Sequence, residues 1–363
     1  MAVSRDERLL RTPLFVRVMR RPELGAVAGF VVVVVFFLFT ANASMFSLAG
    51  IMSWMVPAAQ LGILAVAASL LMISGEFDLS IGSMIGFSGM IFGACLVVWD
   101  FPLWLAIIVT FAMAASYGFI NAQIVLRTGL PSFIVTLAFM FGLKGATLVG
   151  LKLLTGVTIL TGVKEATEGD WLRLFLADDA FESAFMWMGS QGWIDTFRSG
   201  VPKAKGVPVE VLWLLLLTIL ATFVLVRTRF GNWIYASGGD AHAARTSGVP
   251  VERVKTILFM GTACSAALVS IITVLTVGTT HTLAGTLKEF EAVIAAVVGG
   301  CLLTGGYGSA IGAAVGAIIF GMVQIGLTYT SFDLDYYLIF LSGMLLAAVA
   351  ANNYIRRRVT GER

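Results

Sequence analysis

Apolar runs of about 20 residues follow one another along the chain, separated by short polar breaks. A helix of that length reaches across the hydrocarbon core of a membrane, which is about 30 Å thick. Continuous runs such as Val31–Phe39 lack the alternation of a barrel strand. Since backbone groups cannot stay unpaired in lipid, the runs are predicted to be transmembrane helices. The predicted fold class is therefore an all-α polytopic membrane protein with a single transmembrane domain over 1–363.

Ten transmembrane helices are predicted. They cover Leu24–Thr40, Leu48–Ser74, Ile81–Val98, Leu103–Leu126, Pro131–Gly150, Val209–Val226, Val254–Val277, Phe290–Leu303, Ser309–Tyr329 and Tyr336–Tyr354. The second is long and contains Pro57 and Gly62, which favour a kinked or broken helix. The eighth is the shortest, and short or re-entrant segments can change such a count by a pair.

Basic residues set the orientation of these helices. The arginine-rich segment 1–23 precedes the first span and is predicted to be cytosolic by the positive-inside rule. Ten spans also place Arg127, Arg227, Arg229 and Arg356–Arg358 in the cytosol, whereas an odd count would put one of these clusters outside. Both termini are therefore predicted to be cytosolic. A cleaved signal peptide is the alternative for the first span, but no small-residue cleavage site follows it cleanly.

Composition agrees with a membrane protein and excludes several functions. Only 12% of residues are charged, against about 25% in soluble domains. Cys95, Cys264 and Cys301 lie in apolar runs and are interpreted as small buried side chains rather than disulfide partners. No Gly-Lys dipeptide occurs, so the chain lacks a Walker A loop, and the zinc-protease and serine-hydrolase motifs are also missing. A membrane enzyme is therefore disfavoured.

Two polar segments interrupt the apolar pattern. Segment 151–207 is near neutral and carries three tryptophans, and five preceding spans make it an extracytoplasmic loop. Segment 231–253 is predicted to be cytosolic. Within it, Asp240 can cap a short helix over Ala241–Ser247, which Gly248 would end in a left-handed conformation. Two helical turns are unstable alone in water, so this helix must pack on the spans or on a partner; an ordinary loop is the alternative.

Glu76 and Asp78 are acids that follow the second span. Charged side chains in a membrane are costly and usually functional, so one interpretation places the pair on a translocation path or in proton coupling. In the other, Asp78 caps the helix that starts near Leu79, and Glu76 is solvated or paired with a base. Lys144, inside or at the outer end of the fifth span, either snorkels to the interface or faces a polar cavity.

A weak internal repeat occurs at an offset of 230 residues. Gly75, Ile81, Gly82 and Gly86 match Gly305, Ile311, Gly312 and Gly316. Transporters often contain repeats, but small residues at helical spacing also form helix-packing faces, and the packing interpretation is favoured.

Four motifs carry a resemblance to a known family. They are Gly75–Ser83 (GEFDLSIGS), Gly129–Leu137 (GLPSFIVTL), Gly231–Val254 and Ala295–Gly312. In order and spacing they resemble motifs of the permease subunits of ribose-type sugar ABC importers, and the likeness covers nearly the whole chain. This chain departs from the pattern at Glu76, where glycine is common, at Asp240, where asparagine is common, and in its longer 151–207 loop.

The resemblance implies a fold related to that of the vitamin B12 importer and a function in monosaccharide import across the bacterial inner membrane. It implies ATP hydrolysis with magnesium on separate ATPase subunits, a second permease copy or paralogue, a periplasmic or extracellular binding protein and surrounding lipid. No cofactor, metal or nucleic acid is expected on this chain. The residues implied to couple to the ATPase are Gly238, Gly239, Asp240, Ala243, Ala244, Arg245 and Gly248. Related permeases for branched-chain amino acids or nucleosides, and a stand-alone secondary carrier, are the alternatives.

Overall fold

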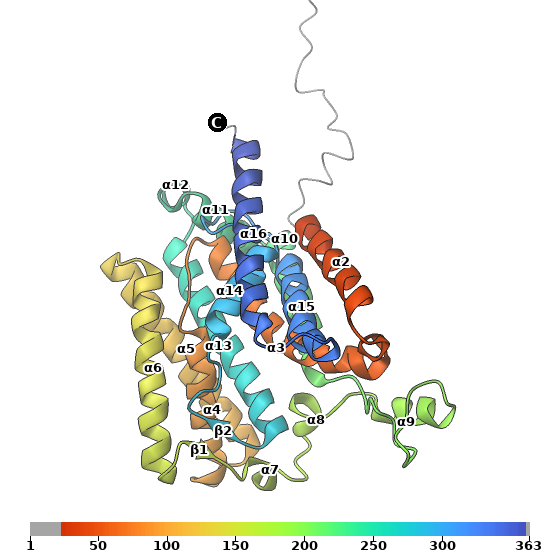
Figure 1. Ribbon diagram of the computed structural model, residues 1–363. Coiled ribbons are helices and arrows are strands. Elements are labelled where there is room, and N and C mark those ends of the chain that lie inside the picture. Colours follow the sequence, from red (N-terminus) through yellow and green to blue (C-terminus); the bar gives the residue numbers. More distant parts are fainter. Residues whose placement is uncertain (1–22, 361–363) are drawn as a thin grey trace, which may run out of the picture.

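The computed structural model describes residues 23–360, so the predicted cytosolic segment 1–23 lies outside it except for Glu23. Within this range ten helices overlap the ten predicted ones (Figure 1). They are α2 (Glu23–Thr40), α3 (Leu48–Ile73), α4 (Ile81–Val97), α5 (Leu103–Thr128), α6 (Ser132–Thr155), α10 (Val209–Arg227), α13 (Val251–Val277), α14 (Lys288–Val298), α15 (Ala310–Gly326) and α16 (Tyr336–Thr360).

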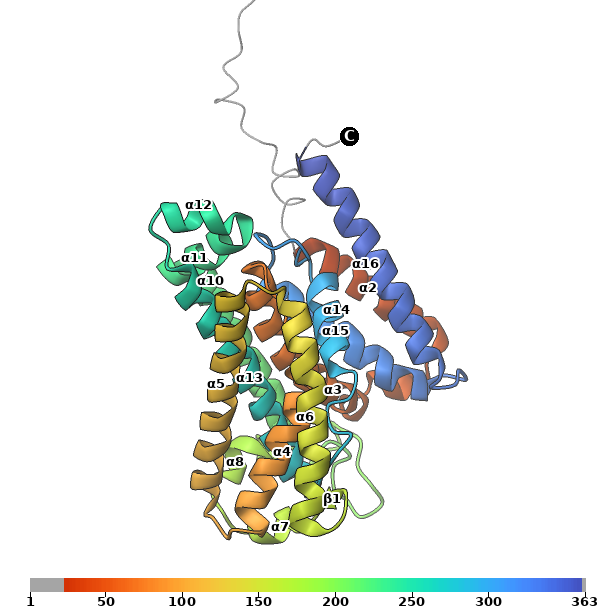
Figure 2. The ribbon, with the colours of Figure 1, turned by 90° about the vertical axis from the view of Figure 1, so that its left-hand side faces the viewer.

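Shorter elements connect these helices. They are η2 (Ala43–Phe46), β1 (Ile159–Leu160), α7 (Val163–Ala166), α8 (Arg173–Leu176), α9 (Glu182–Ser190), α11 (Arg229–Gly239), α12 (Ala241–Thr246), β2 (Thr280–His281) and η3 (Leu327–Tyr329). Figure 2 places α11 and α12 at one end of the bundle and α7 at the other. These ends are named the α12 end, which is predicted to be cytosolic, and the α7 end.

Seven helices in the described range are long and apolar enough to cross a membrane, namely α2, α3, α5, α6, α10, α13 and α15. At 1.5 Å per residue, the 17-residue α4 is about 26 Å long and the 11-residue α14 about 16 Å. A helix of 16 Å covers about half of the hydrocarbon core. The prediction of a spanning helix over Phe290–Leu303 is therefore wrong, because α14 ends at Val298 and a loop follows.

Two segments cross the bundle partly as helix and partly as irregular chain, and they are named the broken crossings. After α3, segment 74–80 leads from the α12 end into α4; after α13, segment 278–287 leads from the α7 end into α14. The starts of the two short helices meet, because a Cβ atom at Gly82 in α4 would lie 2.7 Å from the carbonyl oxygen of Gly285. The two units run in opposite directions, as in the inverted repeats with broken helices that transporters contain.

The packing of α15 explains the glycines of the internal repeat, and the course of α3 shows the effect of Pro57. Gly312 and Gly316 on α15 pack against the backbone of Gly299 and Ala295, where a methyl group would collide. The helix-packing interpretation of those glycines is confirmed. Helix α3 runs unbroken through Pro57, so the predicted break does not occur there, and the alternative of a kink stays a prediction.

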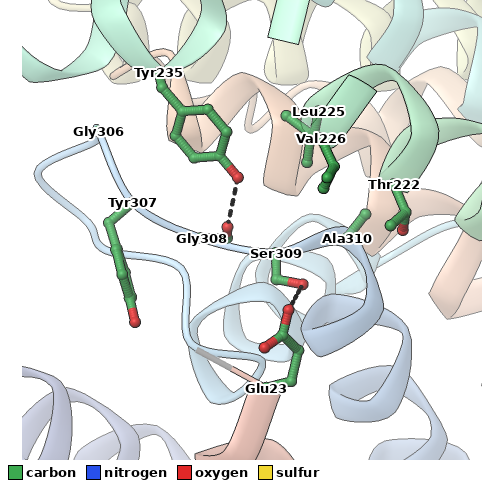
Figure 3. A pocket seen from close by; sticks show the side chains of 10 residues that line it. All are labelled: Glu23, Thr222, Leu225, Val226, Tyr235, Gly306, Tyr307, Gly308, Ser309 and Ala310. Carbon is green, nitrogen blue, oxygen red and sulfur yellow. Dashed lines mark hydrogen bonds between the residues drawn. The ribbon is translucent and has the colours of Figure 1, made fainter. Parts of the chain in front are cut away.

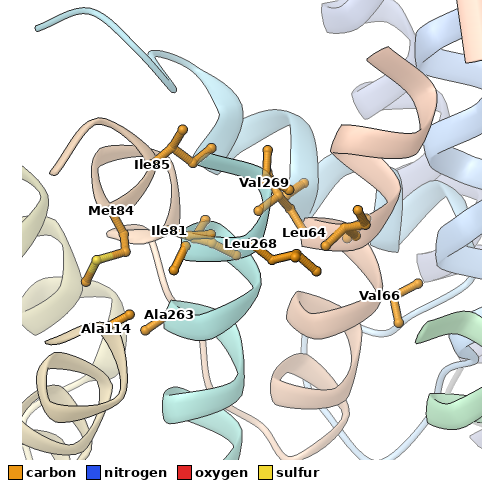
Figure 4. Close-up of a cluster of buried hydrophobic side chains, with 14 of the residues drawn as sticks. Leu64, Val66, Ile81, Met84, Ile85, Ala114, Ala263, Leu268 and Val269 are labelled. Carbon is orange, nitrogen blue, oxygen red and sulfur yellow. The ribbon is translucent and has the colours of Figure 1, made fainter. Parts of the chain in front are cut away.

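The core of the bundle is formed by α3, α4, α13, α14 and α15, with a smaller contribution from α5. Leu64, Ile81 and Val269 lie among its buried side chains (Figure 4). Helix α13 is buried over most of its length by α3, α4 and α5. Helices α4 and α14 therefore pack against long buried helices, which shield the irregular segments 74–80 and 278–287 from lipid.

The long loop between α6 and α10 is folded. Its β1 pairs antiparallel with β2, with Leu160 opposite Thr280, so it is attached to the segment that enters α14. Trp213 of α10 donates a hydrogen bond to the carbonyl oxygen of Phe175 at 2.8 Å. Helix α9 lies away from the bundle (Figure 1). Its exposed Trp187 contacts the exposed Trp193, which follows the helix, with ring centres 5.0 Å apart.

Candidate functional site

The α12 end carries a helical hairpin formed by α11 and α12, of which only α12 was predicted from the sequence. Helix α11 covers residues that the sequence suggested were loop, and Thr228 caps it by accepting from the Gly231 amide at 3.1 Å. Three glycines in α11 lower its intrinsic helix propensity, which explains why it was missed. The next helix, α13, begins at Val251 rather than at the predicted Val254.

Helix α12 begins where the sequence predicted. One carboxylate oxygen of Asp240 accepts from the amides of His242 and Ala243, each at 2.9 Å, and these bonds hold the pKa of Asp240 below its usual value. The helix ends at Thr246, one residue earlier than predicted. Gly248 then adopts a φ of +85°, the left-handed conformation expected of it.

The side chains of α12 divide between the bundle and solvent. Ala244 is buried, whereas Ala243 is exposed. Arg245 Nε donates to Glu252 Oε1 at 2.6 Å, and both side chains are about half exposed. This pair connects α12 to the first turn of α13. The exposed face of α12 thus places the small side chain of Ala243 near Arg245, which suits close approach of another protein.

Glycines join α11 to the rest of the bundle. A Cβ atom at Gly238 would lie 2.7 Å from the Gly306 nitrogen and 2.8 Å from the Ile73 carbonyl carbon, whereas one at Gly239 would meet nothing within 4 Å. The Gly306 amide also donates to the Ile73 carbonyl at 2.8 Å, and a Cβ atom at Gly305 would lie 2.8 Å from Gly75 Cα. The hairpin therefore contacts two segments at once: the start of the segment that enters α4 and the loop that follows α14.

A cavity of about 450 Å³ lies beside this junction (Figure 3). Tyr235 of α11 reaches over it and donates to the Gly308 carbonyl at 3.0 Å. Ser309 donates to Glu23 of α2 at 2.8 Å. These bonds attach the loop after α14 to both α11 and α2.

Glu76 forms an ion pair, one of the predicted alternatives. Lys255 Nζ lies 2.5 Å from Glu76 Oε1, and the two side chains are 9% and 15% exposed. The pair joins segment 74–80 to the second turn of α13. An ion pair this deeply buried is sensitive to the loss of either partner.

Asp78 is buried and does not act as the predicted N-cap. One of its oxygens accepts from the Ser80 amide at 2.9 Å, and the other accepts from Thr262 Oγ1 at 2.6 Å. Ser80 occupies the N-cap position of α4. Thr262 is the twelfth residue of α13, about 16 Å from its start, so Asp78 holds the irregular segment against the middle of a long helix.

Sequence reasoning missed a group of acids at the start of α14. Glu289 pairs with Lys144 of α6 at 3.3 Å, and Glu291 pairs with Lys288 at 2.6 Å. Tyr337 of α16 donates to the second oxygen of Glu291 at 3.1 Å. A lone lysine inside one apolar run and two acids beside another were the available signal, but residues 145 positions apart give no local pattern that pairs them.

Comparison with known proteins places these features in a family. A family model described as "Branched-chain amino acid transport system / permease component" matches residues 50–349. The xylose transport system permease protein XylH of Escherichia coli (strain K12) is 32% identical over 361 residues, covering 92% of each chain. The ribose import permease protein RbsC of the same organism is 31% identical over 292 residues, covering 80% of this chain and 81% of RbsC.

A xylose permease from Haemophilus influenzae is also similar, at 31% identity over 79% of this chain and 84% of its own. No solved structure matches, so the predicted relation to the vitamin B12 importer stays a prediction. The family match covers most of the chain, including both broken crossings and the α11–α12 hairpin. The chain belongs to the family of branched-chain amino acid transport system permease components.

Proposed function

We propose that this chain is the permease subunit of an ATP-driven importer that moves a monosaccharide across the bacterial inner membrane. The observation that carries the proposal is the 32% identity to a xylose permease over 92% of both chains. A ribose permease is similar at nearly the same level, so a pentose is the substrate class we favour within the monosaccharides and related polyols.

The energy source in this proposal is a separate ATPase subunit that binds ATP and magnesium. The chain has no Walker A loop. The ATPase docks on α12, with Gly238, Asp240 and Arg245 among the coupling residues. The exposed small side chain of Ala243 and the half-exposed Arg245 support this assignment. The α12 end and both termini then lie in the cytosol.

A route for coupling follows from the backbone contacts of α11. A movement of the hairpin would displace Gly238, and with it Ile73, which precedes the first broken crossing, and Gly306, which follows the second. Closure of the ATPases would therefore shift segment 74–80 and the loop after α14 together. This is a shift between two populations of the bundle, biased by nucleotide. Asp78 and the Glu76–Lys255 pair lie on the moving segment.

The complete importer in this proposal holds two permease copies, or this chain and a paralogue, and a binding protein that delivers the sugar to the α7 end. A branched-chain amino acid is the second candidate substrate, because the description of the matching family names that class.

The test is to identify the ligand of the cognate binding protein by mass spectrometry and then to measure uptake of that compound with and without this chain. A pentose or hexose whose uptake requires the chain supports the proposal. A branched-chain amino acid or a nucleoside in its place would refute the sugar assignment while keeping the class of importer.

A further inference from the structure

Lys144 lies at the middle of a membrane-spanning helix. It is residue 13 of the 24 in α6, so about 17 Å of helix extends on each side of it. Snorkelling, one of the two interpretations that the sequence allowed, works only near helix ends. The Lys144 side chain turns instead to Glu289, yet it stays 35% exposed on the surface of this chain.

The acids beside Lys144 are buried while the lysines are not. Glu289 and Glu291 are 1% and 7% exposed, and Lys288 is 25% exposed. Glu289 Oε2 accepts no hydrogen bond from the part of the chain that the structure describes, and it lies against Gly82 in the first turn of α4. An unpartnered carboxylate oxygen therefore lies where the two half-helices meet.

Charges at this depth cannot face lipid. Ionisable side chains within membrane spans face a bundle interior or a water-filled cavity. Helix α14, which carries Lys288 and both acids, lies between α6 and α16 in both views (Figures 1 and 2). The face between α6 and α16 therefore meets water or polar groups of another molecule at mid-membrane.

We propose that Lys144, Lys288, Glu289 and Glu291 form a sugar-contacting band of the translocation path, closed on its open side by a second copy of this chain. This inference rests on the proposed function. The partly exposed lysines donate to the hydroxyl and ring oxygens of the passing sugar, and the buried carboxylates of Glu289 and Glu291 hold the two ammonium groups in place. Two ammonium and two carboxylate groups balance, so the band suits a neutral polyhydroxylated ligand rather than an ion.

The test uses cysteine accessibility in the complete importer, reconstituted in vesicles and turning over ATP. Cys95, Cys264 and Cys301 are first replaced with alanine, and sugar uptake by that background is verified. Lys144→Cys is then compared with Gly142→Cys. Gly142 lies within about 3 Å of the same depth but on the opposite side of α6, and a Cβ atom there would meet nothing within 4 Å.

A charged trimethylammonium methanethiosulfonate reagent is expected to modify Lys144→Cys at least tenfold faster than Gly142→Cys. Saturating xylose or ribose, delivered by the binding protein, should slow that reaction several-fold. An aminoethyl reagent, which restores an ammonium group at position 144, should recover part of the lost uptake. Recovery would separate a role in transport from a failure to fold.

Equal labelling at the two positions would refute the water-lined band, and fast labelling without protection by sugar would refute the sugar contact. These two labelling results are interpreted only if the cysteine-free protein still takes up sugar. A background that takes up no monosaccharide, although the native cysteines give ATP-dependent uptake of an amino acid, would instead refute the proposed function. The two failures are thus distinguishable.

Discussion

Replacement of Gly238 by alanine tests whether α11 passes motion to the broken crossings. The added methyl group would lie 2.7 Å from the Gly306 nitrogen and 2.8 Å from the Ile73 carbonyl carbon, well inside the normal carbon contact distance of about 3.5 Å. Overpacking of this kind costs about 1–3 kcal/mol. If this strain falls on one state of the hairpin, the coupling between ATPase and permease changes by roughly 5- to 150-fold.

Gly239→Ala is the matched control, because its methyl group would meet nothing within 4 Å. In a helix, this change is neutral or stabilising by up to about 1 kcal/mol. Uptake, ATP hydrolysis and melting temperature of both variants are measured in the reconstituted importer. We expect Gly238→Ala to hydrolyse ATP with at least a fivefold loss of uptake per ATP, and Gly239→Ala to match the wild type. Equal coupling in the two variants would show that the junction does not transmit motion.

Three further predictions concern the acids. Lys255→Met leaves Glu76 buried and unpaired and should destabilise the permease by about 3–5 kcal/mol. Arg245→Gln, which breaks the exposed Arg245–Glu252 pair, should cost under about 1 kcal/mol. Similar thermal stability of the two variants would contradict this prediction. The lowered pKa of Asp240 means that its cap is complete above the unfolded value of about 4 and is lost as pH falls through the folded pKa. Hydrogen exchange of the two capped amides should therefore accelerate at pH 7 in Asp240→Ala but not in Asp240→Asn. Asp78→Asn keeps an acceptor for the Ser80 amide and should retain most uptake, and a collapse at normal membrane levels would show that Asp78 has a role in the path.

The long helices could be predicted from the sequence because their signal is local. An apolar run reports its own length, and nine of the ten predicted helices coincide with observed ones, whereas the eighth only overlaps the short α14. The short helix after Asp240 could also be predicted, since the cap, the left-handed glycine and Pro250 follow one another within eleven residues. Its end was misplaced by one residue, which lies within the usual fraying of helix termini.

The broken crossings could not be predicted, because their cause is tertiary. Segment 278–287 lies next to segment 159–160 and the first turns of α4, which are remote in sequence. The Lys144–Glu289 and Glu76–Lys255 pairs likewise join residues 145 and 179 positions apart. A single sequence reports that charges occur in apolar surroundings, but not which charges meet.

The central claim is that this chain imports a monosaccharide only as part of an ATP-driven complex. The most direct measurement is uptake of labelled xylose and ribose into vesicles that contain the purified chain alone, or the chain with its ATPase and binding protein. The account predicts uptake only in the complete system and only with ATP on the ATPase side. Uptake by the chain alone, driven by an ion gradient and unaffected by ATP, would contradict it.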